Sequence, residues 1–194
     1  EEVARPPDFL DILRGKVSRT ERNVFIGHFG YFEEGAQFLG EIDARIIQLV
    51  RDPRDIIISH LHTVCDKELK LLGYDVLDFK MPDGLRISEH GDPLEWCIRV
   101  APYWWREWLP WLPLADLVVR FERLVGPDQR DEVDKIAELI PGMDVDEAIA
   151  RINPSGSPSF RKGLVGGWRE EFWPEHAILF DELMDDVMSE LGYD

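Results

Sequence analysis

The pattern of hydrophobic and polar positions predicts short buried strands separated by helices. The strands are the apolar runs at residues 24–26, 45–50 and 114–121, which are bounded by polar or glycine residues. Strands that alternate with helices are typical of an α/β protein with a mostly parallel sheet. We therefore expect an α/β fold for this chain.

Start and stop signals predict where the helices lie. Asp52-Pro53 and Asp92-Pro93 each place an N-cap aspartate before a proline at the first helical position. Gly192 follows the last amphipathic segment and is expected to end it. One helix is predicted to begin at residue 53, and four more are predicted over residues 93–110, 129–139, 145–152 and 174–191. Loops are expected over residues 66–91 and 153–167.

Charge and composition exclude several classes of protein. The 194 residues include 22 Lys and Arg against 39 Asp and Glu, a formal net charge of −17. Sequence-independent binding to nucleic acid depends on Lys and Arg, so we expect no nucleic-acid partner. No apolar run approaches the ~20 residues that span a bilayer, so we expect no membrane partner and a cytoplasmic protein. Cys65 and Cys97 are too few for a disulfide framework or a structural zinc site.

The common catalytic and metal-binding patterns are absent from the sequence. It holds no G-x-x-x-x-G-K-[ST] phosphate loop, no G-x-G-x-x-G and no H-E-x-x-H. His60 and His62 are two residues apart in a predicted helix, so their side chains point to different sides. This spacing favours two solvated surface histidines, and we predict no bound metal.

Arg51 stands at the junction between a predicted strand and a predicted helix. In open α/β sheets ligands collect at the carboxyl ends of the strands, and a helix N-terminus attracts anions through its free N–H groups and its dipole. Arg51 adds a bidentate donor for phosphate or carboxylate, and Ser59, two turns into the helix, is placed to donate a hydroxyl group. The alternative is an Arg51–Asp55 ion pair that only caps the turn, and the residues alone favour neither.

A second cationic segment lies near the C-terminus. Arg161-Lys162-Gly163 is followed by Gly166 and then by Trp168. Glycines let backbone N–H groups approach an oxyanion, and the two cations supply positive charge. Anion binding by this segment is one interpretation, and a flexible surface loop is the alternative.

His28 lies just after the strand predicted at residues 24–26. A histidine at the carboxyl end of a strand is well placed to act as a general base. Taken alone, a loop histidine without a catalytic role is the simpler interpretation of His28.

Together these segments resemble the sulfotransferases that use 3′-phosphoadenosine 5′-phosphosulfate as their sulfuryl donor. Residues 51–55 with Ser59 are similar to the family's 3′-phosphate motif, and residues 161–163 to the C-terminal loop that closes over the same phosphate. Residues 118–124 are similar to the family's tyrosine-glutamate-aspartate-leucine strand end, with Phe121 in the aromatic place that contacts adenine. His28 falls where the family keeps its catalytic histidine.

The resemblance implies a three-layer, P-loop-NTPase-like fold with a mostly parallel sheet flanked by helices. It runs from about residue 24 to the end, and nothing in residues 1–27 is similar to the family's 5′-phosphosulfate loop. We therefore expect residues 1–194 to form a single sulfotransferase-like domain that lacks its N-terminal strand and loop. The family's lysine two residues before the histidine is replaced by Ile26, and the acidic residue before Trp168 by Gly167.

The resemblance also implies an activity, a cofactor and a set of site residues. The activity is sulfuryl transfer from 3′-phosphoadenosine 5′-phosphosulfate to a hydroxyl or amine of a small-molecule acceptor, with 3′-phosphoadenosine 5′-phosphate as product. His28 would be the general base, and the residues expected to bind the nucleotide are Arg51, Ser59, Phe121, Arg161, Lys162 and Gly163. The alternative is a catalytically inactive nucleotide-binding or scaffolding domain of the same fold. A nucleotide kinase or hydrolase ranks last, because it needs the phosphate loop that is absent.

Five tryptophans fall within residues 96–111. Some of them would suit an apolar acceptor pocket. A stripe of aromatic residues at helical spacing is more often part of the core, and we favour that interpretation.

Overall fold

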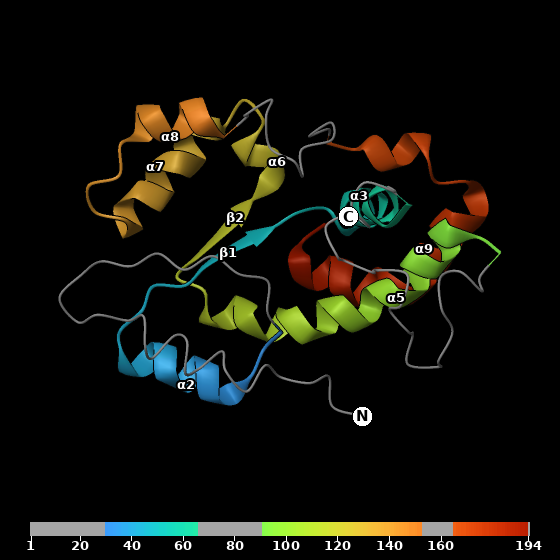
Figure 1. The fold of residues 1–194 in the computed structure, drawn as a ribbon, viewed down its shortest axis with the longest axis horizontal. Helices are drawn as coiled ribbons and strands as arrows, with labels where there is room; N and C mark the ends of the chain where they lie inside the picture. Colours follow the sequence, from blue (N-terminus) through green and yellow to red (C-terminus); the bar gives the residue numbers. More distant parts are fainter. Residues whose placement is uncertain (1–29, 66–90, 153–164, 194) are drawn as a thin grey trace. The chain divides into compact units, whose positions relative to one another are not determined.

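A computed structural model describes residues 30–65, 91–152 and 165–193 of the chain (Figure 1). The chain divides into two compact units, Glu1–Ala44 and Arg45–Asp194. The described part of the first unit holds the helix α2 (Glu33–Glu41), which the sequence pattern did not predict. Its N-cap residue, Phe32, provides no side-chain hydrogen bond, so the usual start signal is missing.

The second unit holds a small parallel sheet. Strands β1 (Ile47–Val50) and β2 (Leu117–Arg120) pair in parallel, as predicted. β2 is shorter than its apolar run, because Leu114 ends the 3₁₀ helix η3 (Leu109–Leu114) and Phe121 begins the short helix α6 (Phe121–Leu124). β1 begins two residues after the predicted start at residue 45. The described residues therefore form a mostly helical α/β structure with two parallel strands. The strand predicted at residues 24–26 lies outside the described residues, and the three-layer arrangement stays a prediction.

The helices begin where their start signals place them, although the helix predicted to end at residue 110 ends at Trp108. Asp52 Oδ1 accepts the backbone N–H of Arg54 at 2.9 Å, and Asp92 Oδ1 accepts that of Leu94 at 2.8 Å. Gly192 ends the last helix with a φ of 68°, a left-handed conformation that favours glycine. The predicted helices are α3 (Pro53–Cys65), α5 (Pro93–Trp108), α7 (Gln129–Leu139), α8 (Val145–Arg151) and α9 (Pro174–Leu191), and a further 3₁₀ helix is η4 (Gly167–Glu170).

The hydrophobic core of the second unit forms where α5 packs on α3 and α9 (Figure 1). Trp96 and Trp105 of α5 are buried within it, and Phe180 and Met184 come from α9. Burying a large apolar side chain stabilises a fold by about 1.5–3 kcal/mol. The other tryptophans of the stripe are buried or pack partly buried against this core: Trp104, Trp108 and Trp111. The interpretation of the stripe as core packing is confirmed.

None of the helices in the described ranges combines the length and the apolar character that crossing a membrane requires.

Candidate functional site

Arg51 and Phe121 meet at the carboxyl edge of the sheet. Val50 lies opposite Arg120 in the strand register, so the residues that follow them leave the sheet side by side. The guanidinium carbon of Arg51 lies 4.5 Å from the centroid of the Phe121 ring. A cation over an aromatic face is attracted by the charge distribution of the ring. The structure therefore brings together two of the residues predicted to bind the nucleotide.

Asp55 joins the first turn of α3 to the glycine-rich segment near the C-terminus, residues 163–168. Its carboxylate is buried, and Oδ2 accepts the backbone N–H of Gly166 at 2.7 Å. Oδ1 accepts the backbone N–H of Trp168 at 3.1 Å. Gly166 has a φ of 76°, which a residue with a Cβ adopts only with strain. Asp55 thus holds the end of the glycine-rich segment beside the strand-to-helix turn that carries Arg51.

The Arg51–Asp55 ion pair, the alternative for this turn, is present but long. Arg51 Nη2 lies 3.9 Å from Asp55 Oδ2. Both oxygens of Asp55 accept backbone N–H groups at shorter distances. The main role of Asp55 in the structure is therefore to bind the glycine-rich segment, which the sequence did not predict.

Trp168 forms a second link between the two segments. Arg54, at the start of α3, places its guanidinium carbon 4.4 Å from the Trp168 ring, and Arg169 places its own at 4.5 Å. Asp52 fixes Arg54 through two parallel contacts, Nε to Oδ1 and Nη2 to Oδ2, both at 2.9 Å. Bidentate arginine–carboxylate pairs have a defined geometry. The Arg54 side chain is thus held in place against Trp168.

The remaining predicted site residues are placed unequally. Ser59 lies in α3 one turn after Asp55, so the two share a helix face, and Ser59 is partly buried. Four of the predicted residues lie outside the described residues, and their roles stay predictions: His28, Arg161, Lys162 and Gly163.

Two residues of this edge were missed by the sequence analysis, Glu122 and Tyr193. The backbone N–H of Asp52 donates to Glu122 Oε1 at 2.8 Å, and the Tyr193 hydroxyl donates to Glu122 Oε2 at 2.8 Å. Burial, together with the neighbouring Glu122 carboxylate, raises the pKa of Tyr193. Glu122 directly follows Phe121 within residues 118–124, which resemble a family motif, so its place in the sequence could have indicated a role at the site. For Tyr193 the only signal was its place after Gly192.

Comparison with known proteins settles the family. A sequence model described as the sulfotransferase domain matches residues 32–152, which is more than half of the chain. The chain belongs to the sulfotransferase family. The matched range includes Arg51, Ser59 and Phe121, and membership implies a P-loop-like fold. A search of curated proteins found no match to the chain.

Of the two histidines of α3, His60 differs from expectation. His60 is not a solvated surface residue, because its ring packs edge-on against Trp104 with centroids 4.4 Å apart. Burial lowers the pKa of His60. His62 points elsewhere, as the spacing predicted, with Nε2 2.7 Å from Glu171 Oε2. The described residues hold no group of three or more side chains suited to a metal ion.

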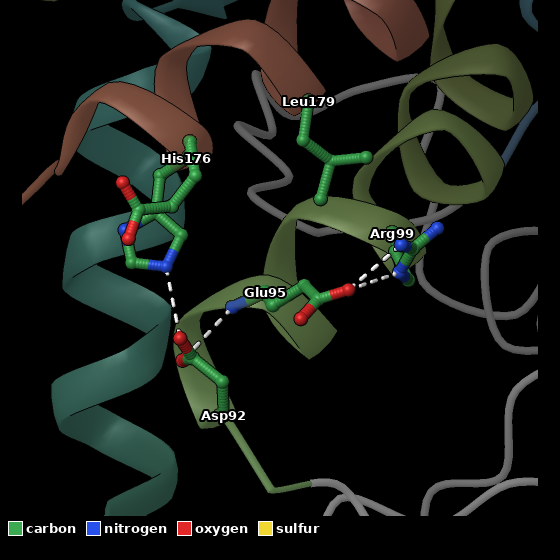
Figure 2. A pocket seen from close by; sticks show the side chains of 6 residues that line it. Asp92, Glu95, Arg99, His176 and Leu179 are labelled. Carbon is green, nitrogen blue, oxygen red and sulfur yellow. Dashed lines mark hydrogen bonds and ion pairs between the residues drawn. The ribbon is translucent and has the colours of Figure 1, made fainter.

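A hollow of about 360 Å³ lies between the first turns of α5 and α9 (Figure 2). Figure 2 shows His176 directed at Asp92 and Arg99 directed at Glu95. His176 Nε2 lies 2.9 Å from Asp92 Oδ2, and Arg99 Nη2 donates to Glu95 Oε1 at 2.7 Å. Burial opposes ionisation of Asp92, but hydrogen bonds from His176 and from two backbone N–H groups outweigh it and lower its pKa. These four side chains pair with one another, and Glu175 and Leu179 complete the lining.

Proposed function

We propose that this member of the sulfotransferase family transfers a sulfuryl group from 3′-phosphoadenosine 5′-phosphosulfate to a hydroxyl or amine group of a small-molecule acceptor. The observation that supports this most is the pair of hydrogen bonds from Gly166 and Trp168 to Asp55. They join the glycine-rich segment to the turn that carries Arg51, as a shared phosphate site requires.

The chemistry of the described residues suits the 3′-phosphate of the donor. Arg51 supplies a guanidinium group at the start of a helix, where the dipole also favours an anion. Phe121 offers an apolar face beside it for an adenine ring. Ser59, on the Asp55 face of α3, would add a hydroxyl donor.

The covalent chain limits how far the second cationic segment can lie from this turn. Arg161 precedes Gly166 by five residues, and five residues span at most about 18 Å when fully extended. Since Gly166 is held on Asp55, we infer that Arg161, Lys162 and Gly163 contribute to the same phosphate site.

The proposed reaction divides the work between binding and proton transfer. When bound, the donor supplies the sulfuryl group, while its 3′-phosphate lies away from the reacting bond. Residues that bind this phosphate hold the donor in position, and such positioning lowers the activation free energy of the transfer. His28 is the proposed base, which takes the proton from the acceptor hydroxyl or amine. The net charge of −17 disfavours a polyanionic acceptor.

A transfer assay with labelled donor and a panel of small hydroxyl and amine acceptors tests this proposal. We expect the wild type to transfer label and His28→Ala to bind 3′-phosphoadenosine 5′-phosphate unchanged without turnover. Arg106→Ala, which removes an exposed arginine paired with Asp186, is the control and should stay active. Near-full turnover by His28→Ala would contradict the base assignment. Nucleotide binding without any transfer by the wild type would favour the inactive nucleotide-binding domain.

A further inference from the structure

The carboxylate of Glu122 connects the end of α9 to the turn between β1 and α3. One of its oxygens accepts the backbone N–H of Asp52, and the other accepts the hydroxyl of Tyr193, both at 2.8 Å. Asp52 is the neighbour of Arg51, and Glu122 is the neighbour of Phe121. The carboxylate therefore joins the two backbone segments that carry the predicted nucleotide-binding side chains.

Tyr193 is itself held from several sides. Its backbone N–H donates to the carbonyl oxygen of Met188 at 2.9 Å, across the left-handed turn at Gly192. The guanidinium carbon of Arg120 lies 4.6 Å from the centroid of the Tyr193 ring. Arg120 Nη2 also donates to the carbonyl oxygen of Leu191 at 2.7 Å. These contacts fix the backbone and the ring of Tyr193. Its hydroxyl group can therefore hold the Glu122 carboxylate in one orientation.

We infer that Tyr193 and Glu122 are positioning residues for the nucleotide site. They fix the Asp52 backbone and thereby orient the Arg51 side chain toward the 3′-phosphate. This inference rests on the proposed function. Without the Tyr193 hydroxyl, Glu122 Oε2 loses its donor in a partly buried place, and the carboxylate gains from turning toward water. The Asp52 N–H then loses its acceptor, and the turn is free to shift. Neither residue touches the reacting atoms in this scheme.

Tyr193→Phe tests the inference, because it removes the hydroxyl and keeps the ring. Tyr103→Phe, at a half-exposed position of α5, is the matched control. Calorimetric titration measures the affinity for 3′-phosphoadenosine 5′-phosphate and for adenosine 5′-phosphate, which lacks the 3′-phosphate. We expect Tyr193→Phe to weaken binding of the first ligand roughly three- to tenfold, part of the effect of a hydrogen bond to a charged group. Binding of adenosine 5′-phosphate and both affinities of the control should stay as in the wild type.

A merely structural role of Tyr193 predicts a different result. General destabilisation would lower both affinities together, or lower only the melting temperature, and either outcome would overturn the inference. Combining Tyr193→Phe with Glu122→Gln gives a second check. If the two residues act as one unit, the loss caused by Tyr193→Phe shrinks in the Glu122→Gln background. Full additivity of the two losses would also overturn it.

Failure of the proposed function gives a separate signature. If the wild type binds neither nucleotide, the proposed function is wrong, and the link is then judged by hydrogen exchange at the Asp52 amide. Faster exchange there in Tyr193→Phe than in Tyr103→Phe would support Tyr193 as the residue that fixes this turn. Equal exchange in the two variants would overturn that role as well.

Discussion

The carboxylate of Asp55 accepts the backbone N–H of Gly166, 111 residues further along the chain, at 2.7 Å. A second hydrogen bond to the same carboxylate comes from Trp168. One buried side chain therefore connects the start of α3 to the glycine-rich segment. The connection thus links the turn that carries Arg51 to the end of the glycine-rich segment.

Asp55→Asn should loosen the connection. The asparagine side chain keeps one oxygen that accepts a backbone N–H. Its NH₂ group faces the other backbone N–H, so that hydrogen bond is lost and two donors face each other. We expect the free energy of unfolding to fall by about 1–3 kcal/mol, together with weaker binding of 3′-phosphoadenosine 5′-phosphate. Chemical denaturation and calorimetric titration measure the two effects. Asp181→Asn, at an exposed position of α9, is the control and should change neither. An Asp55→Asn protein as stable as this control would show that the connection contributes little.

His60 should make stability depend on pH. Its pKa in the folded protein is lowered from the usual 6.5 by burial. Between that lower value and 6.5, the unfolded chain binds a proton that the folded protein does not. The free energy of unfolding therefore falls as the pH decreases below 6.5, by at most about 1.4 kcal/mol per pH unit for one proton.

His60→Phe should remove this part of the pH dependence. Phenylalanine can keep the edge-on contact with Trp104, and it eliminates a buried Nε2 for which the described residues provide no hydrogen-bond partner. At pH 7 to 8 we expect equal or greater stability than the wild type. Urea unfolding from pH 8 to pH 5 measures the slope in the wild type and in His60→Phe. A wild-type slope in His60→Phe would assign the pH dependence to other groups.

Gly192→Ala should destabilise the end of α9. Gly192 has a φ of 68°, and a Cβ there would lie 2.9 Å from Arg120 Nη2. We expect a loss of about 1–2 kcal/mol in the free energy of unfolding, the usual cost of a left-handed conformation for a residue with a Cβ. Gly40→Ala in α2 is the matched control, because a Cβ there meets nothing within 4 Å. It should be neutral or stabilise the protein by up to about 1 kcal/mol. Equal effects of the two changes on thermal or chemical unfolding would contradict this.

Helices with strong local signals were predictable from the sequence. Asp52 and Asp92 each accept N–H groups at the start of their helices, and Gly192 ends α9. Helix α2 lacks such a signal, since Phe32 provides no cap and Gly35 lies in its first turn. The boundaries of β2 were set too wide, because apolar character alone does not distinguish a strand from the short helices that flank it.

The site was predictable only in part. The place of Arg51 and of Phe121 follows from strand ends, which local sequence reveals. The contacts of Asp55 with Gly166 and of Glu122 with Tyr193 join segments far apart in the chain, and no local pattern specifies such pairs. His60 was placed in solvent because helix spacing says nothing about which neighbouring helix covers a residue.

Titration of Arg51→Ala with 3′-phosphoadenosine 5′-phosphate and with adenosine 5′-phosphate tests most directly whether Arg51 binds the 3′-phosphate. Arg106→Ala, which removes an exposed arginine paired with Asp186, is the matched control. Relative to the control, Arg51→Ala should lose about 1.5–3 kcal/mol of binding free energy for the first ligand and little for the second. An unchanged affinity for 3′-phosphoadenosine 5′-phosphate in Arg51→Ala would contradict the assignment of this edge as the phosphate site.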